Sequence, residues 1–228
     1  MNNSHISPVN KLTYGIGSIA YGVKSNGFDY WFLIFYSQAM GVDAYLVGLA
    51  LMISLVIDSL SDPLIGYFSD NTRTRWGRRH PFMYAAAIPV SLSYFFIWNP
   101  PASLSGNELF GYILFLAILV RTLITIYEIP NSAMVAEMTE DYDERTSILS
   151  YRFFFGWSGG TLMGACTSYY LLVPTSEYSH GIFNVAGYGQ MGLVAALISF
   201  TAIMTSAIGT HNLIPNLKPA PTKRKLTI

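Results

Sequence analysis

Six stretches of mainly apolar residues, separated by shorter polar segments, run along the chain. They lie near residues 12–40, 44–68, 81–98, 109–138, 147–173 and 184–209. A helix that crosses a membrane needs about 20 such residues, because the hydrocarbon layer is about 30 Å thick and each residue rises about 1.5 Å. We therefore predict an all-α membrane protein with six transmembrane helices over residues 1–213, followed by a proline-rich, basic tail at 214–228.

The composition agrees with a membrane protein. Of the 228 residues, 52% are hydrophobic and only 11% are charged, against about 25% charged in an ordinary soluble domain. The formal net charge is zero and no basic patch is interleaved with aromatic residues, so nucleic acid is not an expected partner. Cys166 is the only cysteine, which excludes an intrachain disulfide and a cysteine-based metal site. The N-terminal segment lacks the pattern of a removable signal peptide, and we expect the first helix to be retained.

Basic residues occur in the loops on one side of the predicted bundle. They are Lys11, Arg73, Arg75, Arg78, Arg79, Arg145, Lys218, Lys223, Arg224 and Lys225. The opposite loops, around 41–43, 99–108 and 174–183, contain no lysine or arginine. Because cytoplasmic loops carry the excess of basic residues, we predict a multi-pass protein of the plasma membrane with both termini in the cytoplasm.

Seven ionisable residues fall inside the predicted helices. They are Lys24, Asp29, Asp58, Asp62, Arg121, Glu128 and Arg152. An ionised side chain at mid-membrane costs at least about 2.5–3.5 kcal/mol, so these groups should pair with one another or line a wet cavity. The alternative is a set of ion pairs between helices that serves assembly alone.

Helical spacing groups some of these residues into a candidate cation site. Asp58 and Asp62 are four residues apart and share one helix face, and Arg121, Thr125 and Glu128 share another. Oxygen ligands of this kind suit hard cations. The seven charges sum to one excess negative charge, which an entering sodium ion or proton would neutralise. We expect no other cofactor and no structural metal.

Several motifs carry a resemblance to a known family. They are KLTYGIG at 11–17, DSLSDP at 58–63, GYFSDNTRTRWGRR at 66–79, EIPNSAMVAEMTEDYDERT at 128–146 and YRFFF at 151–155. Together they cover nearly the whole chain. It resembles the N-terminal half of the glycoside–pentoside–hexuronide:cation symporters of the major facilitator superfamily, which implies one six-helix half of a transporter.

The resemblance implies roles for individual residues. The cation-binding aspartates of the family match Asp58 and Asp62, and its accessory oxygen ligands match Ser61 and Thr125. The family's solute-binding acid and base match Glu128 and Arg152. Two positions depart from the family: Gly22 stands where a sugar-binding aspartate is expected, and Ser132 stands where a stacking tryptophan is expected. Asp29 is a substitute for the aspartate, Lys24 is a further solute-binding candidate, and Trp31 or Trp157 can supply stacking area.

A cytoplasmic gate is also implied by the resemblance. Acidic residues of the stretch 140–146 would face basic residues of the loop before the third helix. The candidates are Asp70, Arg75, Arg78, Arg79, Asp141, Asp143 and Glu144. Exposed pairs contribute about 0–1 kcal/mol each, so such a latch would bias a conformational equilibrium rather than hold the fold together. A merely solvated loop is the alternative.

Two functions remain open on the sequence. The first is cation-coupled symport of a small polar solute, a sugar or glycoside, between this half and a second six-helix half or another copy of the chain. The second is a six-helix structural or regulatory subunit that binds no solute. Enzyme activity is not expected, because the chain contains no HExxH, GxxxxGK[ST] or GxSxG pattern. A channel is disfavoured, because paired NPA motifs and a TVGYG-like filter are absent from the sequence.

Overall fold

The computed structural model describes residues 6–217, and this part of the chain is helical, without strands. Most of the predicted tail, with its lysines and arginine at 218–225, lies outside the described residues. The α-helices are α1 (Pro8–Ile16), α2 (Ser18–Asn26), α3 (Ala44–Asn71), α4 (His80–Ile97), α5 (Gly106–Met138), α6 (Tyr142–Cys166) and α7 (Val185–Gly209). The π-helical segments are η1 (Gly27–Trp31), η2 (Ile34–Ala39) and η3 (Thr167–Leu171), and the 3-10 segments are η4 (Gly181–Phe183) and η5 (His211–Asn216).

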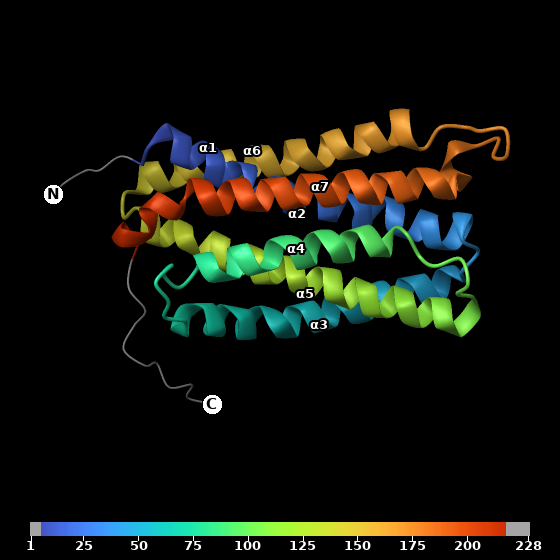
Figure 1. Cartoon of the computed structure of the whole chain (residues 1–228), viewed down its shortest axis with the longest axis horizontal. Helices are drawn as coiled ribbons and strands as arrows, with labels where there is room; N and C mark the ends of the chain where they lie inside the picture. The colour runs from blue at the N-terminus through green and yellow to red at the C-terminus, as the bar shows by residue number, and fades with distance from the viewer. Residues whose placement is uncertain (1–5, 218–228) are drawn as a thin grey trace.

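The axes of the long helices lie side by side along the long axis of the molecule (Figure 1). Three of them begin at residues whose side chains cap the free backbone N–H groups of the first turn. Asp43 caps α3 at 2.8 Å, Asp141 caps α6 at 2.8 Å and Asn184 caps α7 at 3.2 Å. These polar residues therefore fix where the chain leaves a loop and enters a helix.

Four helices, α3, α4, α5 and α7, are long and apolar enough to cross a membrane. The prediction of six such helices is not confirmed. The first predicted helix is divided into α1, α2, η1 and η2, with breaks at Gly17 and Gly27. Helix α6 has 25 residues, but its sequence includes Asp143, Glu144 and Arg152, which lower its apolar character.

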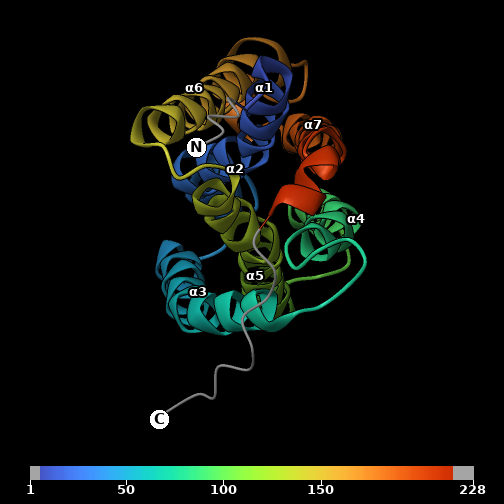
Figure 2. The same ribbon diagram turned by 90° about the vertical axis from the view of Figure 1, so that its left-hand side faces the viewer.

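The packing of the helices reveals a repeat that the sequence does not show. Helix α2 packs on α6, as α5 packs on α3, and α1 and α2 pack on α7, as α5 packs on α4. Helices α4 and α7 contact each other. The first segment (residues 8–39, with α1, α2, η1 and η2) thus corresponds to α5, α3 corresponds to α6, and α4 corresponds to α7. With this correspondence the contacts among the first three segments and the last three form matching pairs. Corresponding segments run in opposite directions along the bundle, which is the arrangement of an inverted repeat (Figures 1 and 2).

The closest approach between helices is the seam between α2 and α6. A Cβ atom added at Gly22 would lie 1.9 Å from the backbone oxygen of Gly156, and one added at Gly160 would lie 2.7 Å from the backbone oxygen of Gly22. Small residues at four-residue spacing let helix backbones touch in this way. No side chain fits at residue 22 without moving the two helices apart, so an aspartate is excluded from this position in the present packing.

The buried core has two parts. One part contains aromatic side chains that contact one another. They come from the first segment, from the end of α4 and from α7, and they include Phe32, Phe35, Trp98 and Tyr188. The other lies nearer the chain termini and contains mainly aliphatic side chains of α4, α5 and α7 together with Tyr14. Helix α3 lies at one edge of the bundle against α5 and buries the smallest share of its span (Figure 2).

The glycine seam generates the first test. We expect Gly22→Ala to lower the free energy of unfolding in detergent by about 1–3 kcal/mol, because the new methyl group overlaps the backbone of Gly156. The matched control is Gly48→Ala, whose added Cβ meets nothing within 4 Å and should leave stability unchanged or slightly higher. Equal thermal unfolding of the two variants would contradict the close packing of α2 and α6.

Candidate functional site

A cavity of about 1170 Å³ lies between the first segment, α3, α5 and α6. All seven charged residues predicted inside the helices line it: Lys24, Asp29, Asp58, Asp62, Arg121, Glu128 and Arg152. Its size is close to the upper end of the range of ligand pockets, about 300–1,000 Å³. The structure therefore brings the candidate cation and solute residues into one shared space.

The candidate cation residues lie on two neighbouring helices. The hydroxyl of Thr125 on α5 donates a hydrogen bond of 2.9 Å to Oδ1 of Asp58 on α3. Oδ1 of Asp62, one turn along α3, is buried and has no hydrogen-bond partner within the described range. The hydroxyl of Ser61 donates to the backbone oxygen of Asp58 at 2.9 Å, and Ser61 is not among the residues that line the cavity. Over residues 6–217, no group of three or more acidic, histidine or cysteine residues is arranged to hold a metal ion.

Glu128 and Arg152 form an ion pair across the cavity between α5 and α6. Arg152 also donates to the hydroxyl of Tyr14 at 3.4 Å, and that hydroxyl donates to the backbone oxygen of Asn131 at 3.1 Å. Tyr14 therefore positions the guanidinium from α1. The motif KLTYGIG contained this tyrosine, but nothing in the sequence indicated its partner, which is 138 residues away.

Lys24 and Asp29 lie on the first segment and line the same cavity. Lys24 is 6% exposed and its ammonium group lies 4.9 Å from the centre of the Tyr21 ring. Asp29 is exposed and lies in the π-helical turn η1. Neither forms an ion pair within 4.0 Å with another residue of the described chain, so both groups are available to a ligand.

The sequence grouped Arg121 with Thr125 and Glu128 on one helix face but gave it no binding role of its own. Its guanidinium lies 3.9 Å from Oδ2 of Asp58 and 5.0 Å from the centre of the Phe28 ring, and the residue is 8% exposed. Asp58 thus faces both Thr125 and Arg121, which are one turn apart on α5. The four-residue spacing that grouped Arg121 with Thr125 in the sequence places both side chains beside Asp58 in the structure.

Several cavity-lining polar atoms are buried and lack a hydrogen-bond partner within the described range. They are Oγ of Ser18, Oδ1 of Asn26, Nε1 of Trp31, Oδ1 of Asp62, Nε of Arg121 and Oε2 of Glu128. Buried polar atoms in folded proteins are nearly always hydrogen-bonded to protein or to ordered water. These atoms come from the first segment, α3 and α5, so unpartnered polar groups occur on several elements around the cavity.

The two positions that depart from the family also line the cavity. Gly22 lies on the seam with α6, and Ser132 donates to the backbone oxygen of Ile129 at 3.0 Å. Of the two tryptophans considered for stacking, Trp31 points its indole nitrogen into a buried position, whereas Trp157 is 76% exposed. Both tryptophans contribute to the cavity wall.

A second charged cluster lies at the end of the bundle that contains the N-terminus. Arg79 contacts Asp70 at 2.6 Å and Glu137 at 2.9 Å, and it donates to the hydroxyl of Ser69 at 2.7 Å. Arg78 contacts Glu137 at 2.7 Å. These residues join the end of α3, the start of α4 and the end of α5. Glu137 was missed in the sequence because its role depends on which helix ends meet.

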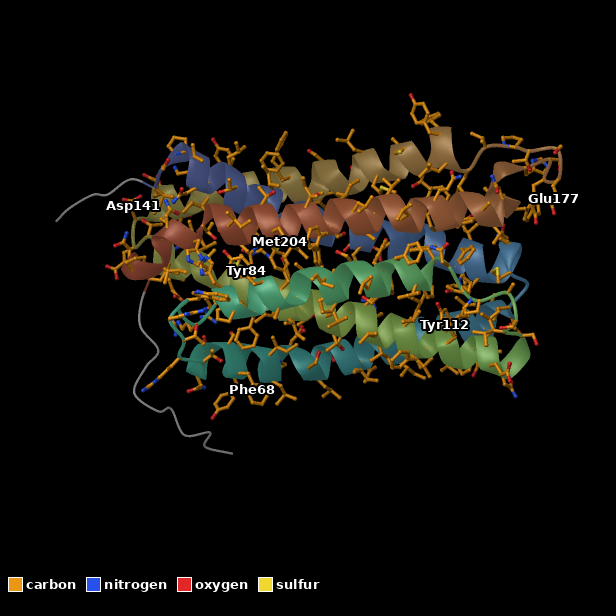
Figure 3. The ribbon with its side chains drawn as sticks, in the orientation of Figure 1. Phe68, Tyr84, Tyr112, Asp141, Glu177 and Met204 are labelled. Carbon is orange, nitrogen blue, oxygen red and sulfur yellow. The ribbon has the colours of Figure 1, made fainter. Side chains whose placement is uncertain are left out.

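In this conformation Asp141, Asp143 and Glu144 do not form the predicted ion pairs with Arg75, Arg78 and Arg79. Glu144 contacts Lys11 of α1 at 2.9 Å and accepts a hydrogen bond from the backbone N–H of Ile6 at 2.8 Å. Asp141 caps α6, Asp143 is exposed, and Arg75, instead of facing an acid, lies 5.4 Å from the centre of the adjacent Trp76 ring. The reason is the packing of α6, which begins against α1, whereas the basic loop lies at the ends of α3, α4 and α5 (Figure 3).

The arginine cluster generates the second test. We expect Glu137→Gln to lower the free energy of unfolding by about 3–5 kcal/mol, because it leaves two largely buried guanidinium groups without their shared carboxylate. The matched control is Asp143→Asn, an exposed position on the neighbouring helix that should change stability little. Thermal unfolding of both variants in detergent measures the difference, and equal stability would show that the cluster is not structural.

Comparison with known proteins adds an independent finding. The profile of the MFS/sugar transport protein family matches residues 13–227. An uncharacterized symporter of Synechocystis is 32% identical over 87% of this chain and 36% of its own length. The inner membrane symporter YicJ of Escherichia coli is 27% identical over 97% of this chain and 46% of its own length, and the isoprimeverose transporter of Lactiplantibacillus pentosus is 23% identical over 96% and 44%.

The chain spans less than half the length of these relatives. The family profile nevertheless covers nearly all of it, and its charged cavity contains Asp58, Asp62, Thr125, Glu128 and Arg152, which are the residues that the resemblance to cation symporters singles out, apart from Ser61. The chain belongs to the MFS/sugar transport protein family, a family of membrane transporters.

Proposed function

We propose that the chain is one half of a cation-coupled symporter for a sugar or glycoside. The observation that carries this proposal is the shared cavity, in which Asp58, Asp62 and Thr125 lie on one side and Glu128 and Arg152 on another. The relatives named as symporters and as an isoprimeverose transporter support the solute class. Their greater length supports the need for a second six-helix half or another copy of the chain.

We also propose that six segments cross the membrane, with both termini on the cytoplasmic side of the plasma membrane. The first segment is divided into helices of nine residues or fewer and α6 is too polar to be identified as a span, but the two segments pack along α7 and along each other like the other long segments. Their charged residues Lys24 and Arg152 face the cavity rather than lipid. Spanning helices tolerate ionisable residues in this position, where a water-filled cavity solvates them.

The coupling ion binds at Asp58 and Asp62 in this mechanism. Without it, the two carboxylates lie one turn apart, and within residues 6–217 only Asp58 has an ion-pair partner within 4.0 Å, the guanidinium of Arg121 at 3.9 Å. A sodium ion can take oxygen ligands from both aspartates and Thr125, whereas a proton can neutralise Asp62, whose Oδ1 has no hydrogen-bond partner in the described structure. Either ion removes the excess negative charge.

The solute binds between Glu128 and Arg152 and reaches toward Lys24 and Asp29. A charged hydrogen-bonding group contributes more per contact than a neutral one, and sugar hydroxyls can donate to Glu128 and accept from Arg152. Both sites include α5, because Thr125 and Glu128 are one turn apart on that helix. Ion binding and solute binding are therefore expected to strengthen each other by the same factor.

The arginine cluster of Asp70, Arg78, Arg79 and Glu137 closes the cytoplasmic end of the cavity in this proposal. It ties the ends of α3, α4 and α5 together through contacts of 2.6–2.9 Å. Access from the cytoplasm then requires these pairs to separate. A closure made of few ion pairs can open when ligands shift the equilibrium by a few kcal/mol.

The cation assignment is tested in a carrier that contains this chain, reconstituted in vesicles. We expect Asp58→Asn and Asp62→Asn to abolish gradient-driven solute uptake, because each removes a carboxylate of the ion site. The matched control is Asp43→Asn at the outer end of the same helix, where asparagine still caps α3. Wild-type dependence on a sodium or proton gradient in both site variants would refute the assignment. Absence of any cation-dependent uptake in the wild type would favour a structural or regulatory subunit.

The shared role of α5 is tested by calorimetric titration of solute with and without the cation. Saturating cation should improve solute affinity roughly 5–150-fold in the wild type, and Glu128→Gln should shrink that factor. Arg152→Ala should weaken solute binding and leave cation binding less affected. Glu108→Gln, at an exposed position on α5, is the control. A pair that serves only assembly would instead give lower stability in both variants and an unchanged ratio of affinities.

A further inference from the structure

A second, smaller hollow lies between α4 and α7, away from the charged cavity. Its volume is about 410 Å³, within the usual range of ligand pockets. The wall consists of Trp76, Tyr84, Ala87, Ile88, Phe200, Met204 and His211. Figure 3 labels Tyr84 and Met204, which lie close together where the two helices run side by side. We call this hollow the α4–α7 groove.

The α4–α7 groove is polar at one end and apolar along the rest. At its polar end the hydroxyl of Tyr84 lies 3.0 Å from Nδ1 of His211 and donates to the backbone oxygen of Ala207 at 3.1 Å. Toward mid-membrane the wall is formed by Ala87 and Ile88 of α4 and by residues of α7. The positions lining the groove on the α7 side, 200–211, extend over about 16 Å at 1.5 Å per residue. This gradient matches the passage from headgroup region to hydrocarbon in a membrane.

A cation lies at the mouth of the groove. The guanidinium of Arg75 is 5.4 Å from the centre of the Trp76 ring, and Trp76 is 41% exposed. Arg78 and Arg79 of the same loop are neutralised by Asp70 and Glu137. Arg75 makes no ion pair with any residue between 6 and 217, and no acidic residue lines the groove. The mouth is therefore suited to an anionic group.

We propose that the α4–α7 groove binds one anionic phospholipid of the cytoplasmic leaflet. Its phosphate lies at Arg75 and Trp76, and an acyl chain lies along Ile88, Phe200 and Met204. Both helices are apolar enough to cross the membrane, and Ile88 is 59% exposed on the side that lipid would cover. Basic residues between helices on the cytoplasmic side bind such headgroups, and tryptophan and tyrosine favour this depth.

The chain's own tail is a poorer occupant than a lipid. Residues 214–228 contain four basic residues and no acidic one, so Arg75 repels rather than attracts them. An anionic lipid is complementary in both charge and polarity. The groove is also separate from the solute cavity, since the two sets of lining residues have no member in common. The proposal therefore stands or falls independently of the transport function.

The test is native mass spectrometry of the full chain, released from nanodiscs that contain equal amounts of phosphatidylglycerol and phosphatidylcholine. We expect the wild type to retain one phosphatidylglycerol with a preference of about fivefold over phosphatidylcholine, the effect of one basic residue near the surface. Arg75→Gln should keep a bound lipid and lose the preference. Added glycerol phosphate should not displace the lipid, because the acyl chain supplies much of the binding.

Two variants of α7 separate a specific site from the general lipid shell. Met204→Trp fills the groove and should abolish retention of the lipid, whereas Leu197→Trp adds the same side chain at a 59% exposed position outside the groove and should leave retention unchanged. Equal retention in Met204→Trp and wild type overturns the proposal. An unchanged lipid preference in Arg75→Gln, or displacement by glycerol phosphate, overturns it as well.

Discussion

The fold depends on the cost of placing ionised groups inside an apolar bundle. At mid-membrane each such group costs at least about 2.5–3.5 kcal/mol unless it is paired or solvated. The seven charged residues within the predicted helices all line one cavity, where they can be paired or solvated. The segments that carry them, namely the first segment, α3, α5 and α6, therefore surround that space. Helices α4 and α7 contribute no residue to the cavity and pack behind it. The glycine seam of α2 and α6 allows this ring of helices to close on one side.

The same cost explains which parts of the site the sequence could predict. Charges such as Asp58 and Glu128 stand out in apolar stretches, and four-residue spacing indicates which of them share a helix face. The depth of each charge along its helix follows from counting residues, which is why a common cavity was foreseeable. Tyr14 and Glu137 were not foreseeable as site residues. Tyr14 is one of many tyrosines in apolar helices, and Glu137 lies in the last turn of α5 beside the acidic stretch 140–144, so only the contacts between helices reveal their roles.

The sequence likewise identifies some of the helices as membrane spans and not others. Apolar length alone identifies α3, α4, α5 and α7, and side-chain caps at Asp43, Asp141 and Asn184 mark where helices begin. The first segment does not meet that criterion because it is divided into short helices, and α6 does not meet it because of its charged and small residues. In α6 the residues that line the cavity and form the seam, Arg152, Gly156 and Gly160, are thus among those that lower its mean hydropathy. The inverted repeat is likewise invisible in sequence, since it resides in the contacts and not in matching residues.

Helix α5 is where the separate parts of the molecule meet. Thr125 and Arg121 contact Asp58 on α3, Glu128 contacts Arg152 on α6, and Glu137 contacts Arg78 and Arg79 near the C-terminal end of α5. Pro130, between the cavity and that end, removes one backbone hydrogen bond from α5 and makes this turn the easiest place to bend. Tyr14 braces the following residue by its hydrogen bond to the backbone oxygen of Asn131. A shift of Arg152 therefore reaches α5 at two points, directly through Glu128 and through Tyr14, so the position of Arg152 is linked to the geometry of α5 on both sides of Pro130.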